Sequence, residues 1–182
     1  MSEPVAGGPV SRDRIADLLA ASATMILTEL AALGPDGGWR PDPGEWSANE
    51  CVGHLIEVER RGFAGRIRRI LAADPPDIPA ALEDWDPPAV AAARRDDLRP
   101  SAELAAEFAA LRADGVALVR GLGPADMTRV GMHELVGLLR VEDLLGEWVH
   151  HDRNHLRQTL AVTQARVWGQ MGNARRFSLE DF

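Results

Sequence analysis

The sequence predicts an all-α fold in which four long helices form a bundle joined by long loop connections. Apolar residues recur with the helical period of about 3.6 residues along several long stretches, and proline- and glycine-rich segments separate these stretches. β-Branched residues are sparse, and no stretch shows the period-two alternation that is typical of a half-buried strand. Amphipathic helices bury their apolar stripes against one another, and a bundle builds ligand sites from the side chains that face its interior.

The first predicted helix covers about residues 12–33. Ser11 stands where an N-cap would, because a serine hydroxyl can accept a hydrogen bond from a backbone N–H of the first turn. The preceding residues, 1–10, are small and rich in glycine and proline, and we expect them to be disordered. We expect one domain over residues 11–172, followed by a C-terminal tail over residues 173–182.

A loop and a capping box precede the second predicted helix. Residues 34–46 hold four glycines, three prolines and two tryptophans, which indicates a loop with two aromatic anchors. Ser47 and Glu50 form a capping box, in which each side chain satisfies a backbone N–H of the other residue. The second helix is therefore expected to run from this box to about Ala72.

Proline-rich chain connects the second helix to the rest of the bundle. Residues 74–88 contain several acidic side chains, but their spacing does not match an EF-hand, and the prolines favour a plain loop. The alanine-rich residues 89–98 predict a short helix. A third long helix is expected from Ser101 to about Leu122, and a compact segment, residues 125–139, leads to the last helix.

Composition and charge limit the possible partners. The 182 residues suffice for one core, and the single cysteine, Cys51, cannot form an internal disulfide. The net charge of −8 argues against nucleic acid as a partner, because phosphate binding requires a basic surface. No apolar run approaches the roughly 18 residues of a membrane helix, and no secretory signal is visible. We therefore expect a cytoplasmic protein that does not bind membranes.

The last helix, expected over about residues 140–169, carries the most informative motif. His151 and His155 stand four residues apart, so their Cβ atoms lie about 5–6 Å apart on one helix face and both imidazoles can bind one metal ion. Both histidines continue an apolar seam that includes Trp148 and Val162, which predicts that they point inward. A buried imidazole needs partners for its nitrogens, and one metal ion serves both rings.

His54 is the candidate third ligand. It lies on an apolar seam of the second helix with Cys51 and Val58, and the second and fourth helices can be neighbours in a bundle. Three neutral imidazoles with an open position are typical of a catalytic metal site, not of a closed structural one. The alternative is that His54 is an ordinary core histidine. Cys51 is either a soft ligand or a small buried hydrophobe.

Other polar residues receive a simpler interpretation. His150 lies about 100° from His151 around the helix, so we interpret it as a flanking residue, and His133 lies in an expected turn. A basic cluster on the second helix is interpreted as a solvated face, not as an anion or partner site. It comprises Arg60, Arg61, Arg66, Arg68 and Arg69.

Two segments resemble the DinB-like (DinB/YfiT-like) superfamily of metal-binding four-helix bundles. Residues 45–50, Glu-Trp-Ser-Ala-Asn-Glu, with residues 52–55, Val-Gly-His-Leu, are similar to the tryptophan, capping box and first histidine of that family. Residues 147–158 resemble its terminal His-Asp-x-x-His-x-x-Gln signature. The resemblance extends from Ser11 to about Gln170, which is nearly the whole chain.

The resemblance implies a divalent metal ion, zinc or nickel, held by His54, His151 and His155, and a homodimer. It does not imply one reaction, although it implies a small-molecule substrate. Characterised relatives include thiol S-transferases that use bacillithiol or mycothiol and a mycothiol-dependent maleylpyruvate isomerase. Our first hypothesis is therefore a metal-dependent thiol S-transferase, in which the ion lowers the pKa of a thiol cosubstrate.

Two alternatives remain open. A metal-dependent hydrolase is one, because His151-Asp152-x-x-His155 has the spacing of the zincin motif with aspartate in place of glutamate. Asp152 is interpreted as a residue behind the ligands or at the surface, and Glu147 as a carboxylate placed to orient an imidazole or as a surface residue. The other alternative is a non-catalytic dimeric interaction module. The sequence identifies no catalytic residue beyond the ligands.

Overall fold

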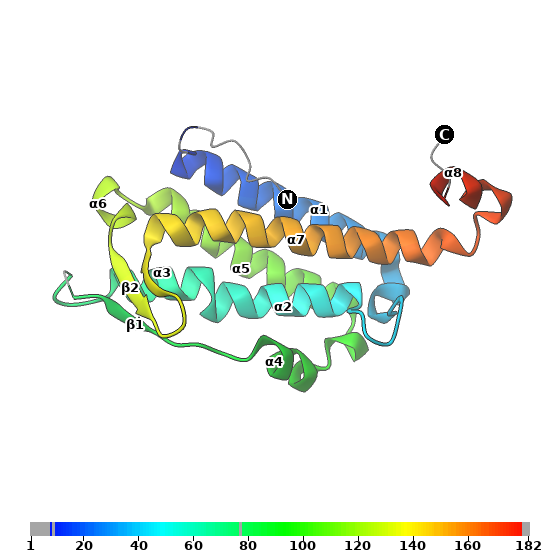
Figure 1. Cartoon of the computed structure of the whole chain (residues 1–182), viewed down its shortest axis with the longest axis horizontal. Helices are drawn as coiled ribbons and strands as arrows, with labels where there is room; N and C mark the ends of the chain where they lie inside the picture. Colours follow the sequence, from blue (N-terminus) through cyan, green and yellow to red (C-terminus); the bar gives the residue numbers. More distant parts are fainter. Residues whose placement is uncertain (1–7, 9, 77, 180–182) are drawn as a thin grey trace.

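The computed structural model describes residues 8, 10–76 and 78–179, and its body is a bundle of long helices (Figure 1). The bundle helices are α1 (Arg12–Leu33), α2 (Ala48–Arg61) with its extension α3 (Phe63–Leu71), α5 (Ser101–Gly121) and α7 (Val141–Trp168). Helices α1 and α2 each pack against both α5 and α7. The predicted four-helix bundle is therefore confirmed, and the second and last helices are neighbours.

Local sequence signals place the first two helices. The Ser11 hydroxyl accepts a hydrogen bond from the backbone N–H of Arg14, so the predicted N-cap of α1 is present. The capping box of Ser47 and Glu50 is present in full. Arg40 holds the Glu50 carboxylate through two hydrogen bonds, which attaches the loop before α2 to the first turn of that helix.

The second helix was expected to be continuous, and this was wrong at Gly62. Helix α2 ends at Arg61, and α3 begins at Phe63 on nearly the same line (Figure 1). Gly62 has a ψ of −115°, which is not helical, and a Cβ added there would lie 2.6 Å from the carbonyl oxygen of Val58. Only glycine fits this break without a clash.

A small sheet at one end of the bundle corrects the expectation that the chain has no strands (Figure 1). Strand β1 (Ala80–Leu82) pairs in parallel with β2 (Val130–His133), and β2 pairs antiparallel with β3 (Gly137–Arg140). Strands of three or four residues are too short for a period-two pattern to be recognised. Their pairing also joins segments that are far apart in the sequence.

Short elements complete the connections. They are η1 (Gly34–Gly38), α4 (Pro87–Arg94), η2 (Asp96–Leu98), α6 (Pro124–Met127), η3 (Gly172–Arg175) and α8 (Arg176–Leu179). Helix α4 lies along the outer side of α2 (Figure 1). The short helix expected over residues 89–98 is interrupted at Arg95, which has a φ of 50°.

The domain boundaries stay a prediction. Of the segment expected to be disordered, residues 1–7 and 9 lie outside the described residues. The described part of the expected C-terminal tail, residues 173–179, belongs to η3 and α8.

The expectation that the chain does not bind membranes also stays a prediction. One described segment, Arg12–Gly38, is apolar enough to span a membrane by length and composition. In the structure its helix α1 contributes Leu19 and Ile26 to the core.

A buried ion cluster crosses the centre of the bundle. Arg112 of α5 donates hydrogen bonds to Glu59 of α2, to Asp152 of α7 and to the carbonyl oxygen of Leu19 in α1. All three charged side chains are at most 3% exposed. Trp148 donates its indole N–H to the same Glu59 oxygen at 3.2 Å. One guanidinium group therefore contacts all the bundle helices.

Replacing Arg112 should destabilise the fold strongly. In Arg112→Leu, two buried carboxylates lose their partner, and we expect the free energy of unfolding to fall by about 3–5 kcal/mol. Urea denaturation followed by circular dichroism measures this change. The control is Arg120→Leu on the same helix, where an exposed ion pair with Asp17 should contribute less than about 1 kcal/mol. Equal losses in both variants would contradict this role of the cluster.

Candidate metal centre

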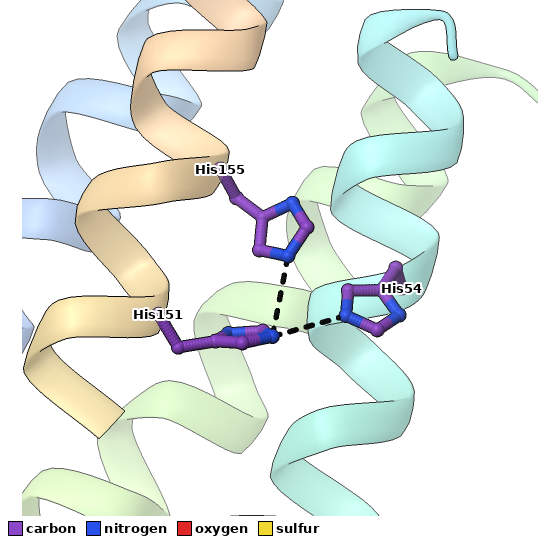
Figure 2. A group of neighbouring side chains, drawn as sticks. All are labelled: His54, His151 and His155. Atoms are coloured by element: carbon purple, nitrogen blue, oxygen red, sulfur yellow. Dashed lines mark hydrogen bonds between the residues drawn. The ribbon is translucent and has the colours of Figure 1, made fainter. Parts of the chain in front are cut away.

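The structure brings His54, His151 and His155 together at the interface of α2 and α7. Figure 2 shows the three rings pointing toward one another, His54 from α2 and the other two from successive turns of α7. The Nε2 atom of His151 lies 3.2 Å from the Nε2 atoms of both His54 and His155. His54 and His155 are each only 8% exposed, and His151 is half-buried. The predicted inward orientation of these side chains is therefore confirmed.

The donor atoms fit a single metal ion. One donor nitrogen from each ring forms a group whose members all lie within 4.8 Å of one another. Two nitrogen ligands of a tetrahedral zinc ion, each about 2.0–2.1 Å from the metal, would lie about 3.3 Å apart. The one Nε2 lone pair of His151 cannot accept good hydrogen bonds from two rings at once. A cation between the rings satisfies all of them better than ring-to-ring hydrogen bonds do.

The environment keeps the imidazoles neutral, as metal ligation requires. Burial lowers the pKa of His54 to about 4 and that of His151 to about 3, and the neighbouring histidines add to both shifts. Burial also lowers the pKa of His155, although Gln158 and Asp152 oppose this change. All three rings are therefore uncharged at neutral pH and keep a lone pair for a metal ion.

Aromatic side chains surround the histidine cluster. Trp46, from the loop before α2, stacks on His155 with ring centroids 6.2 Å apart and also contacts His54. Trp85, between β1 and α4, stacks on His54 with centroids 5.8 Å apart. Phe63 meets His151 edge-on. These rings limit access of water. The Trp85 segment was predicted to be a plain loop, and its contact with the site was not predicted.

The structure decides between the alternative interpretations of Asp152 and Glu147. Asp152 is fully buried and bound to Arg112, so the surface interpretation of this residue was wrong. Its place behind the ligands agrees with the other interpretation, since its charge opposes the lowering of the His155 pKa. Glu147 is exposed, and no described contact joins it to an imidazole, which agrees with a surface residue.

The remaining candidates lie outside the cluster. Cys51 is buried, and burial raises the pKa of its thiol to about 12, which agrees with a small hydrophobe. His150 is exposed on the flank of α7, as predicted. His133 was expected in a turn, but it lies in β2, is buried, and has its Nε2 atom 3.0 Å from Arg66.

The basic cluster is only partly a solvated face. Arg68 is exposed, as expected, whereas Arg66 is half-buried between α3 and the sheet. The arginines at 60, 61, 66 and 69 line a pocket of about 470 Å³ together with Trp85. The interpretation of the whole cluster as a solvated face was therefore incomplete, because the loop that closes the pocket comes from elsewhere in the chain.

Comparison with known proteins agrees with this geometry. The family model of the DinB superfamily matches residues 36–159, which include the loop before α2 and all three histidines. The chain belongs to the DinB superfamily. This membership confirms the resemblance seen in the sequence.

A solved structure has the same DinB fold. It is that of YfiT from Bacillus subtilis, which is described as a probable metal-dependent hydrolase with an unusual four-helix bundle topology. The similarity has a TM-score of 0.75 and 17% sequence identity, and it covers 90% of this chain and 94% of YfiT. At this identity the likeness shows the fold alone. No curated protein matches the chain.

The lowered pKa values predict how the stability of metal-free protein depends on pH. An unfolded histidine has a pKa of about 6.5, so between pH 6.5 and pH 4 the unfolded chain binds more protons than the folded one. The free energy of unfolding should therefore fall as the pH drops through this range. The slope is up to about 1.4 kcal/mol per pH unit for each histidine.

Urea denaturation in the presence of a chelator, at several pH values, measures this slope. The double variant His54→Gln/His151→Gln lacks two of the titrating rings, while its carboxylates still titrate. Its stability should change less between pH 6.5 and pH 5 than that of the wild type. Parallel curves for the two proteins would show that the buried imidazoles do not cause the pH dependence.

Proposed function

We propose that this protein is a metal-dependent enzyme that transfers a small-molecule thiol to an electrophile, with His54, His151 and His155 as the metal ligands. The observation that carries the proposal is the convergence of three neutral, buried imidazoles at metal-ligand spacing. Among the described residues, no fourth protein ligand completes this group. An open position of this kind is typical of catalytic metal sites.

The residues around the ligands favour thiol transfer over other reactions. A divalent ion at this site would lower the pKa of a bound thiol from about 8.5 and so supply a thiolate at neutral pH. The carboxylates nearest the cluster are already engaged, Asp152 by Arg112 and Glu57 by arginines. A thiol whose pKa a metal has lowered below the ambient pH would release its proton to solvent and needs no such base, whereas activation of water usually benefits from one.

The aromatic walls have a defined role in this proposal. Trp46 and Trp85 lie against the histidine rings and limit the space that water can occupy. Exclusion of water strengthens electrostatic interactions in the site and protects a thiolate from proton exchange with solvent. The sulfur forms a bond to the electrophilic carbon, and the leaving group departs with the bonding electrons.

Hydrolysis is the second candidate function. It is favoured by the likeness to YfiT, which is described as a probable metal-dependent hydrolase. The homodimer and the preference for zinc or nickel remain expectations from the family resemblance, and the cytoplasmic location remains an expectation from the sequence. If the protein binds no metal, the conclusion is that it is a non-catalytic interaction module.

Metal content is the first test. Protein purified without an affinity tag should contain about one divalent ion per chain by elemental mass spectrometry. His54→Ala and His155→Ala should each lower this content at least about tenfold, because loss of one of three ligands weakens the site strongly. His150→Ala is the matched control, since His150 is exposed beside the site. Protein that cannot be loaded with zinc, nickel or manganese would contradict the proposal.

The reaction class is tested on metal-loaded protein. Mycothiol, bacillithiol and glutathione are each combined with an alkyl halide or an epoxide, and loss of free thiol is followed. Ester and amide hydrolysis are measured in parallel. We expect thiol consumption that falls at least about 100-fold in His54→Ala, a loss of about 2.7 kcal/mol in transition-state stabilisation. Hydrolysis without thiol transfer would support the second candidate instead.

A further inference from the structure

A pocket beside the histidine cluster carries an unusual concentration of arginines. Its volume is about 470 Å³, which lies in the range of small-molecule sites. Its cationic lining consists of Arg60, Arg61, Arg66 and Arg69, against the acidic residues Glu83 and Asp84. The whole chain carries a net charge of −8, so this local excess of positive charge contrasts with the rest of the molecule.

Most of these arginines have carboxylate partners, but Arg66 does not. Arg69 holds Glu83 at 2.8 Å. Arg66 donates to the carbonyl oxygen of Glu83 and contacts His133, and among the described residues no carboxylate lies within ion-pair distance of it. Its Nε atom is buried and has no described hydrogen-bond partner. Arg66 is therefore a half-buried cation that lines the pocket and forms no ion pair with a described carboxylate.

The carboxylates near the pocket pair with Arg60, Arg61 and Arg69, but none of them forms an ion pair with Arg66. Glu57 faces three guanidinium groups, those of Arg60, Arg61 and Arg94. Of these, Arg60 also pairs with Glu107 and Arg94 with Asp96. Asp84 is half-exposed and lies 3.7 Å from the Nε2 atom of His133, and Glu83 is held by Arg69. The lining itself carries four arginines against two carboxylates, and guanidinium groups bind carboxylate and phosphate oxygens through charge-assisted hydrogen bonds.

Trp85 connects this pocket to the candidate metal centre. Its ring lines the pocket and stacks on His54, and the guanidinium carbon of Arg61 lies 5.5 Å from the centre of the same ring. One side chain therefore forms a wall of both the arginine pocket and the histidine cluster. A molecule bound in the pocket lies beside the ring that covers His54.

We propose that this pocket binds the anionic end, a carboxylate or a phosphate, of the small molecule that reacts at the histidine cluster. Arg66 supplies the main contact, and Arg61 and Trp85 complete the site. This inference rests on the proposed function for the reacting end of the molecule. The binding of the anion itself depends only on the arginines.

Isothermal titration calorimetry of the full chain tests the inference without an enzyme assay. The probes are malonate, inorganic phosphate and the uncharged analogue malonamide, at low ionic strength, with both metal-loaded and metal-depleted protein. We expect one anion per chain to bind in both forms and malonamide not to bind. Malonate and phosphate are compared directly to establish which kind of anionic group the pocket takes.

Matched variants locate the binding site. Arg66→Gln should weaken anion binding at least tenfold, whereas Arg68→Gln, an exposed position on the same helix that does not line the pocket, should stay within twofold of the wild type. Circular dichroism and metal content check that each variant is folded and loaded. Should Arg66→Gln not fold, Arg61→Gln takes its place, with an expected loss of about fivefold.

The possible outcomes separate this inference from the proposed function. Anion binding that is lost in Arg66→Gln, in a protein that transfers no thiol and hydrolyses no ester, supports the pocket and overturns the proposed function. Thiol transfer by a protein that binds none of the anions, or binds them equally well in Arg66→Gln, overturns the pocket. Equal binding of malonamide and malonate would also overturn it.

Discussion

The architecture depends on one buried guanidinium group. Arg112 contacts α1 through Leu19, α2 through Glu59 and α7 through Asp152, while it belongs to α5 itself. A buried charge costs several kcal/mol unless all its partners are in place, so packings that displace one helix are disfavoured. Gly115 of α5 permits Glu59 and Trp148 to approach the α5 backbone closely. A Cβ at this position would lie 2.8 Å from a Glu59 oxygen and 2.9 Å from the Trp148 ring.

The geometry of the candidate metal centre depends on the buried ion cluster of Arg112, Glu59 and Asp152. His54 lies on the same helix as Glu59, and His151 directly precedes Asp152. Any rotation or sliding of α2 against α7 that breaks the ion cluster would also separate the imidazole nitrogens. The burial that holds these helices together lowers the pKa values of the same histidines. Fold stability and readiness for a metal ion therefore have a common physical origin.

Much of this arrangement could be predicted from local patterns. The capping box at Ser47 and the spacing of His151 and His155 depend only on residues within one or two helical turns, so they could be recognised directly. The break at Gly62 was missed because a single glycine is compatible with a continuous helix. The surface interpretation of Asp152 stayed open because the spacing does not reveal that Arg112 reaches α7.

The sequence by itself determined the helices, their caps and the face of each helix that carries a histidine, because these depend on neighbours three or four residues away. Only the tertiary structure decided the partner of each buried charge, the stacking of Trp85 on His54 and the enclosure of Arg66. These contacts join residues tens of positions apart. They depend on the paths of loops and the angles between helices, which no local period encodes.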